Sequence, residues 1–314
     1  MFGLFGKRSG KAIKSTRPEP TYEMSDGPVI GYVLLRDAVS RKQIIEVLNE
    51  HISDDEVFEW DEDATDGDTV GCTINGLWVP ISLVDAPFPD GEAQGVLHPM
   101  FAGDDPEAIA EHRAFLLVPG MPGISNGDSD DGAPLSHFDA VINHVQIVRG
   151  LLRLEEAVGY YSGDVETTYG KEPYLSFTEA EDPLTAAFLA SVWIAQREDG
   201  AWDAYSTGLT KWGIPEIQVV GSTRQPGDLF PYLMDIVEYL LGGARIRAGE
   251  TLGRDKNEKI TTSWQPSIVD HEQTGPPIGD VTMTREGAPM HDIERLINVD
   301  NPTWPHLQKL IFDE

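Results

Sequence analysis

The sequence predicts an α+β fold with mostly antiparallel sheets and helices packed on one face. Apolar runs of strand length recur along the chain, and two longer segments repeat apolar residues at helical spacing. An Asn-Gly pair at 75–76 and an Asp-Gly pair at 199–200 each stand between two apolar runs, as in a tight type I′ hairpin. At 314 residues, the chain fits two related ferredoxin-like units or one large fused domain.

The first α+β unit is expected at 29–180. Its first helix should begin at Ser40, because Gln43 follows three residues later and completes a capping-box pattern. Proline, glycine and aspartate predict long loops at 85–108 and 119–134. The expected elements are a strand at 29–35, the helix to about 52, hairpin strands at 70–74 and 77–84, a strand at 112–118, a helix at 136–156 and a strand at 158–161.

The second α+β unit is expected at 181–270, between two irregular ends. Residues 1–28 are predicted to form a flexible basic tail, and residues 271–314 a Pro-rich irregular extension with one short helix at 291–297. The expected elements of the unit are hairpin strands at 187–196 and 201–208, a strand at 216–220, a helix from Asp228 as its cap to Leu241, and a last hairpin of 250–253 and 259–264.

Charge and cysteine content limit the classes of partner and the compartment. The net charge is −30, and five basic residues within 1–17 leave −35 for the remainder. Nucleic acid is not expected to bind the folded body, because its phosphates would be repelled. The single cysteine, Cys72, cannot form an internal disulfide and indicates the reducing cytoplasm. No apolar stretch reaches the roughly 18 residues of a membrane span, so we expect no membrane insertion.

No pattern in the sequence predicts a catalytic residue. Residues 123–127 match the nucleophile-elbow pattern G-x-S-x-G, but the Asp- and Gly-rich residues that follow cannot form the helix that the elbow requires. The fold could bring His112, His137 and His144 together, but the last two lie two helical turns apart, roughly 10 Å, which is long for one metal. We therefore expect no catalytic residue, no metal site and no cofactor.

The acidic segment at 54–68 is the first candidate binding site. Its carboxylates surround one aromatic residue, and an aromatic anchor within a polar rim is typical of protein–protein hot spots. Acidic side chains at this density also attract a cationic protein over long range. The segment could instead serve only to keep the chain soluble. The candidate residues are Asp54, Asp55, Glu56, Trp60, Asp61, Glu62 and Asp63.

The second candidate is the motif Thr-Gly-Leu-Thr-Lys-Trp-Gly-Ile-Pro-Glu at 207–216. Its glycines and proline predict a tight crossover between two strands. Within it, Trp212 would cover the core or an adjacent groove, and Glu216 would begin the following strand. These two residues therefore either complete the crossover or contact a ligand.

The motif resembles the signature of an uncharacterised bacterial family of domains of unknown function, the DUF4261 type. That signature is Thr-x-Gly-Leu followed by aromatic-Gly-x-Pro-Glu. The residues at 111–114 and the hairpin that begins near 191–193 resemble the same family, so the resemblance spans roughly 29–265. It implies no established catalytic residues and a loose association with bacterial toxin–immunity and secretion loci.

Together these observations favour a non-enzymatic protein-binding function. The specific form that the resemblance implies is a bacterial immunity protein, and the charge fits a basic toxin as its target. One alternative is a hydrolase of unknown substrate, with its site near 212–216 or near His112 and His144. Another is an accessory or structural protein of a bacterial secretion system.

Overall fold

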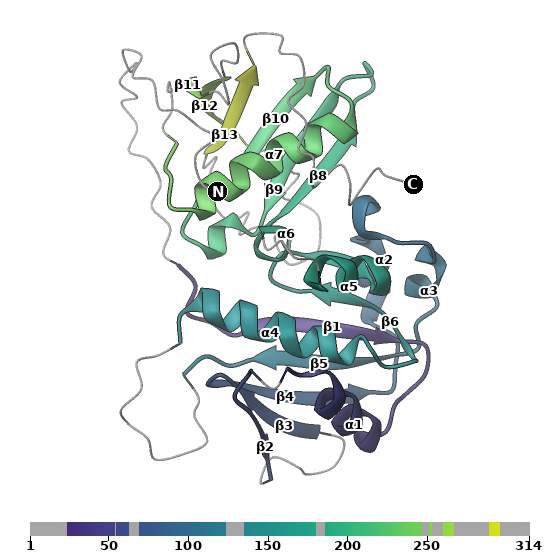
Figure 1. Cartoon of the computed structure of the whole chain (residues 1–314). Coiled ribbons are helices and arrows are strands. Elements are labelled where there is room, and N and C mark those ends of the chain that lie inside the picture. The colour runs from purple at the N-terminus through teal and green to yellow at the C-terminus, as the bar shows by residue number, and fades with distance from the viewer. Residues whose placement is uncertain are drawn as a thin grey trace. The chain divides into compact units, whose positions relative to one another are not determined.

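A computed structural model describes the chain over the ranges 24–53, 55–62, 69–123, 135–179, 186–246, 251–252, 260–266 and 289–295, the last three as backbone. The chain divides into two compact units (Figure 1). We call Ser25–Phe188 the N-terminal unit, and Leu189–Glu314 together with Met1–Met24 the C-terminal unit. The predicted boundary between 180 and 181 falls within 180–185, outside the described residues.

The N-terminal unit is built on a seven-stranded antiparallel sheet with the strand order β2-β3-β4-β5-β1-β6-β7. Its strands are β1 (Val29–Leu35), β2 (Phe58–Asp61), β3 (Thr69–Ile74), β4 (Leu77–Val84), β5 (Ala114–Gly120), β6 (Ala157–Ser162) and β7 (Thr167–Gly170). Strand β1, the first in the described residues, therefore lies inside the sheet, between β5 and β6. The predicted α+β class with mostly antiparallel sheets is confirmed.

Three helices cover one face of this sheet: α1 (Arg41–His51), α4 (His137–Leu151) and α5 (Lys171–Glu179) (Figure 1). Ser40 caps α1 in the predicted capping box. The helices α1 and α4 pack closely, because a Cβ at Gly150 would lie 2.8 Å from Leu48 Cδ2. α4 ends before the predicted residue 156, since the chain forms successive turns there that lead into β6.

Four short helical turns follow β4, largely where the sequence predicted a loop, and two of them lie over the opposite face of the sheet. They are η1 (Pro89–Gly91), α2 (Glu92–Gly95), η2 (Pro99–Phe101) and α3 (Pro106–Ala110). Three of them begin with proline, whose fixed φ and missing N–H suit the first residue of a helix. Side chains of α2 and α3 join those of the strands in an apolar cluster: Leu34, Ala93, Ala108, Ile109, Phe115, Val158 and Tyr161.

The predicted two-residue hairpin at Asn75-Gly76 is confirmed. Asn75 has a φ of 46° and Gly76 a φ of 84°, and Ile74 pairs directly with Leu77. Both loop residues are left-handed, as a type I′ turn requires. Residue Val57 holds the turn from outside, because its N–H donates to Asn75 Oδ1 at 3.0 Å and its carbonyl accepts from Asn75 N at 2.8 Å.

The C-terminal unit contains a six-stranded sheet with the order β11-β12-β13-β10-β9-β8. The short helix α6 (Ala186–Leu189) spans the boundary between the units at Phe188 and Leu189. The elements of the C-terminal unit are β8 (Ser191–Gln196), β9 (Trp202–Thr207), η3 (Leu209–Lys211), β10 (Ile217–Ser222), α7 (Pro226–Leu241), β11 (Thr251–Leu252), β12 (Ile260–Pro266) and β13 (Pro289–Arg295). Helix α7 packs against β8 and β9. The predicted last hairpin forms between β11 and β12.

Two predictions about helices in this unit are wrong. The short helix expected at 291–297 is instead part of strand β13, which pairs antiparallel with β12 along its length and parallel with β10. Such long-range pairing overrides a weak local preference. Asp228 is not the cap of α7, because the helix already begins at Pro226 after the cap residue Gln225. Proline is favoured at that first position.

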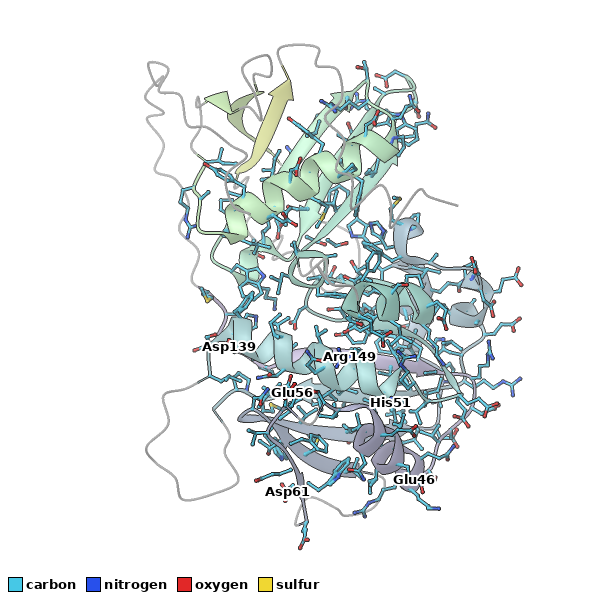
Figure 2. The ribbon with its side chains drawn as sticks, viewed as in Figure 1. Glu46, His51, Glu56, Asp61, Asp139 and Arg149 are labelled. Carbon is cyan, nitrogen blue, oxygen red and sulfur yellow. The ribbon has the colours of Figure 1, made fainter. Side chains whose placement is uncertain are left out.

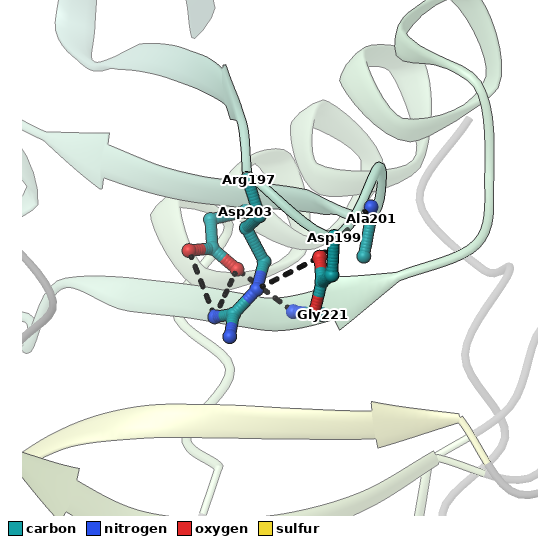
Figure 3. Close-up of polar contacts among 5 residues, drawn as sticks. All are labelled: Arg197, Asp199, Ala201, Asp203 and Gly221. Carbon is teal, nitrogen blue, oxygen red and sulfur yellow. Dashed lines mark hydrogen bonds and ion pairs between the residues drawn. The ribbon is translucent and has the colours of Figure 1, made fainter.

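The hairpin at Asp199-Gly200 forms with a longer loop than predicted. Gly200 is left-handed, with a φ of 84°, but Asp199 is not. Arg197 N donates to Ala201 O and Gly200 N donates to Arg197 O, which makes a three-residue loop with a bulge. In this loop, Asp199 Oδ1 accepts from Ala201 N at 3.1 Å. The Arg197 guanidinium pairs with Asp199 and Asp203 (Figure 3).

Candidate protein-binding surface

The acidic segment lies at one edge of the N-terminal sheet. Glu56 precedes the edge strand β2 and Asp61 ends it (Figure 2). Glu56 accepts a hydrogen bond from Asn75 Nδ2, and Asp61 Oδ2 accepts one from Trp78 Nε1 at 3.2 Å. These two carboxylates therefore support the neighbouring hairpin. Of the remaining acidic candidates, Asp55 and Glu62 are exposed, and Asp54 and Asp63 lie outside the described residues.

The side chain of Trp60 lies on the face of the sheet that α1, α4 and α5 cover. It pairs with Cys72, which is fully buried beneath α1 and α4. The indole Nε1 donates to Asn49 Oδ1 of α1 at 2.9 Å, and the ring meets Phe58 edge-on at 5.1 Å. The side chain thus fastens α1 to the edge strand.

We expect the substitution Trp60→Phe to lower the free energy of unfolding by about 1 kcal/mol, because it removes one hydrogen bond and part of the ring. Asn49→Ala should have a similar effect. If the two side chains act through their mutual bond, the double variant should lose less than the sum of the single losses. Urea denaturation measures all three. Full additivity would contradict this role.

Beyond the short helices, the face opposite α4 carries partly exposed side chains among the described residues. The strand register aligns Tyr161, Tyr32, Leu117, Ser82 and Thr69 across five strands. Residues directly opposite each other in antiparallel strands share a face, and the Thr69 and Ser82 hydroxyls lie 2.9 Å apart. All of these residues except Tyr161 are partly exposed. We call this row the open face.

An aromatic group forms one end of the open face. The ring of Tyr32 stacks on Tyr161 at 5.6 Å and 17°, and meets Phe88 edge-on at 4.8 Å and Phe115 edge-on at 5.8 Å. The Tyr161 hydroxyl donates to Glu92 Oε1 at 2.6 Å. Tyr32, Phe88 and Glu92 remain partly exposed. We call these five residues the Tyr32 patch.

The charged groups that act on the two tyrosines are carboxylates. Burial raises the pKa of Tyr32, and Glu92 and Asp164 raise it further. Burial likewise raises the pKa of Tyr161, with contributions from Glu92 and Glu166. Negative charge therefore accumulates beside the partly exposed ring of Tyr32. Such an arrangement can hold a cation against the aromatic faces.

The second sequence candidate lies in the C-terminal unit, and both of its named residues are buried. Trp212 is 8% exposed, and its Nε1 donates to Leu189 O at 2.8 Å. Its backbone forms an isolated bridge with Met24, within the segment that was expected to be a free tail. Trp212 thus closes the crossover between β9 and β10.

Glu216 is the centre of this crossover. Its carboxylate accepts from Ser206 Oγ at 2.6 Å and from Thr210 N at 3.2 Å, and also from the N–H groups of Gly208 and Leu209. Gly208 has a φ of 98°, which turns successive N–H groups toward one point. Burial raises the pKa of Glu216 to about 7 in spite of these bonds. The spacing of the motif is explained by this internal turn.

Two of the candidate histidines, His112 and His144, and the cysteine are buried. His112 Nε2 accepts from Phe88 N, and its Nδ1 lies 2.6 Å from Ile109 O, on the side of α3. His144 is bonded to a carbonyl of β5 on the side of α4, so the sheet separates the two rings. Burial raises the pKa of the Cys72 thiol to about 12. Within the described ranges, no group of three His, Cys, Asp or Glu is placed to hold a metal ion.

These features define an α+β protein with a half-buried aromatic and acidic surface on its N-terminal unit. Residues 205–274 match the model of the family described as "Domain of unknown function (DUF4261)". The matched segment contains the motif at 207–216 and lies within the C-terminal unit, and there the resemblance to this family is confirmed. Comparison with curated proteins and with solved structures gives no match. No helix in the described part of the chain has both the length and the apolar character to cross a membrane.

Proposed function

We propose that this chain is a non-enzymatic protein-binding protein with a cationic protein partner. The observation that carries the proposal is the Tyr32 patch, in which partly exposed aromatic rings lie beside the carboxylate of Glu92. Aromatic side chains in a partly desolvated setting are the usual energetic anchors of protein interfaces. Adjacent carboxylates select a positively charged partner.

The net charge independently supports a cationic partner. At −30, the chain creates a long-range negative potential that speeds its encounter with a cationic protein. Trp60 is occupied in fastening α1, so the exposed acids Asp55 and Glu62 would contribute to this field rather than form an anchored contact. We therefore assign steering to the acidic segment and binding energy to the Tyr32 patch.

The narrower form of the proposal is an immunity protein that neutralises a basic toxin. A toxin that acts on an anionic substrate needs a cationic active-site surface, which an acidic inhibitor can cover. An accessory role in a secretion system would use the same surface. A hydrolase has less support, because Glu216 and His144, whose pKa values are strongly shifted, are buried and bonded within the fold.

The experiment is purification of the full-length tagged chain from its own cells at low salt, followed by rate measurements with the recovered partner. We expect a cationic protein. Tyr32→Ala should raise Kd at least about tenfold, mainly through faster dissociation, because it removes the central ring. Glu92→Gln keeps the acceptor for Tyr161 but removes the charge, so it should slow association and flatten its salt dependence.

Two variants serve as matched controls. Glu50→Gln removes an exposed charge from α1, on the other side of the sheet, and should change neither rate by more than about twofold. Tyr32→Phe retains the ring and should retain most of the affinity. Circular dichroism verifies that each variant is folded. An acidic partner would overturn the proposal. So would association and dissociation rates that are unchanged in both Tyr32→Ala and Glu92→Gln.

A further inference from the structure

We infer that the Tyr32 patch binds an arginine side chain of the partner, an inference that rests on the proposed function. The patch presents one aromatic face and one carboxylate at the same place. Tyr32 is stacked on Tyr161 and edged by Phe88, so its ring is fixed while it keeps partial exposure. A planar cation can lie over such a ring without reorganising the protein.

Hydrogen-bonding capacity remains next to this ring. In the described part of the chain, the Tyr32 hydroxyl makes no hydrogen bond. Glu92 receives the Tyr161 hydroxyl on Oε1 only, and a carboxylate has about four acceptor sites. The Tyr32 hydroxyl and Glu92 Oε2 are therefore two acceptors beside the same stacked pair of rings. Binding to both requires a cation with several N–H groups spread in one plane.

Guanidinium meets this requirement better than ammonium does. Arginine is planar, weakly hydrated and able to stack on an aromatic face, and its forked N–H groups match a carboxylate in a bidentate manner. Lysine carries a compact, strongly hydrated charge that loses more on leaving water. The apolar stem of the arginine would lie along Leu117, the next residue of the open face, which is also partly exposed.

The test uses two blocked tetrapeptides of equal charge, tetra-arginine and tetra-lysine, with the full-length chain at one fixed ionic strength. Calorimetry gives the affinities, and ¹³C-labelled tyrosine rings report the contact by NMR. We expect tetra-arginine to bind about tenfold more tightly than tetra-lysine. It should shift the ring signals of Tyr32 and Tyr161, which are assigned through the Tyr32→Phe and Tyr161→Phe variants.

Variants then locate the site. Glu92→Gln and Tyr32→Ala should each remove most of the difference between the two peptides, whereas Glu50→Gln should preserve it. Equal affinities, absence of binding, or a preference that survives both patch variants would overturn the arginine assignment. These outcomes leave the proposed function standing if the natural partner still depends on Tyr32. Failure of the proposed function itself would appear as insensitivity of that partner to Tyr32→Ala.

Discussion

Replacing Glu216 by leucine is expected to lower the free energy of unfolding of the C-terminal unit by at least about 3 kcal/mol. The carboxylate accepts bonds from Ser206 Oγ, from Thr210 N and from the N–H groups of Gly208 and Leu209. Leucine fills a similar volume but accepts none of them. Each buried donor left without a partner costs about 1–3 kcal/mol. Loss of this one side chain should therefore open the whole crossover.

Urea denaturation measures the loss of stability. Hydrogen exchange in β9 and β10 then shows whether the loss occurs in the C-terminal unit. Glu216→Gln retains one carbonyl acceptor, so its loss should be smaller than that of Glu216→Leu. Glu198→Gln is the matched control, because Glu198 is exposed in the β8–β9 loop. A Glu216→Leu variant as stable as this control would show that the motif is not held by the carboxylate.

The same variants test how the stability of the C-terminal unit depends on pH. The folded pKa of Glu216, about 7, lies above its usual value of 4.5 because the side chain is buried. The folded state therefore retains this proton longer than the unfolded state. The resulting stability is present below pH 4.5 and is lost as the pH rises through about 7, an effect of about 3 kcal/mol. Glu216→Leu and Glu216→Gln should lack it.

The second large effect is acid destabilisation of the N-terminal unit through His144. The side chain is 1% exposed, and its Nε2–H donates to Val118 O at 2.6 Å. Burial lowers its pKa to about 4 from 6.5. The unfolded state takes up the proton first, so stability is present above pH 6.5 and is lost as the pH falls through about 4. The expected loss is about 3 kcal/mol.

Hydrogen exchange in α4 and β5 at several pH values separates this effect from that of Glu216, which has the opposite sign. His144→Gln can still donate to Val118 O but does not titrate, so the pH dependence between 6.5 and 4 should largely disappear. His51→Gln is the control, because His51 is exposed at the end of α1. An unchanged acid response in His144→Gln would assign the loss to other groups.

The candidate surface could be predicted only in part from residue patterns. The sequence placed Tyr32 and Tyr161 in strands but gave no reason to connect them, because β1 and β6 become neighbours only through the sheet. It identified Trp60 as aromatic and acid-flanked, yet the side of the strand on which it lies depends on the register with β3. Glu216 was found through its motif, but its role depends on donors that only the folded crossover brings together.

The sequence alone determined the features that depend on neighbours within a few residues. The β1 strand, the Ser40–Gln43 capping box and the Asn75-Gly76 turn are of this kind, because their energies come from local dihedral angles and local hydrogen bonds. Only the tertiary structure decided the strand order, the strand β13 and the open face. These depend on contacts between distant segments, whose stabilisation comes from burial and pairing that no local pattern encodes.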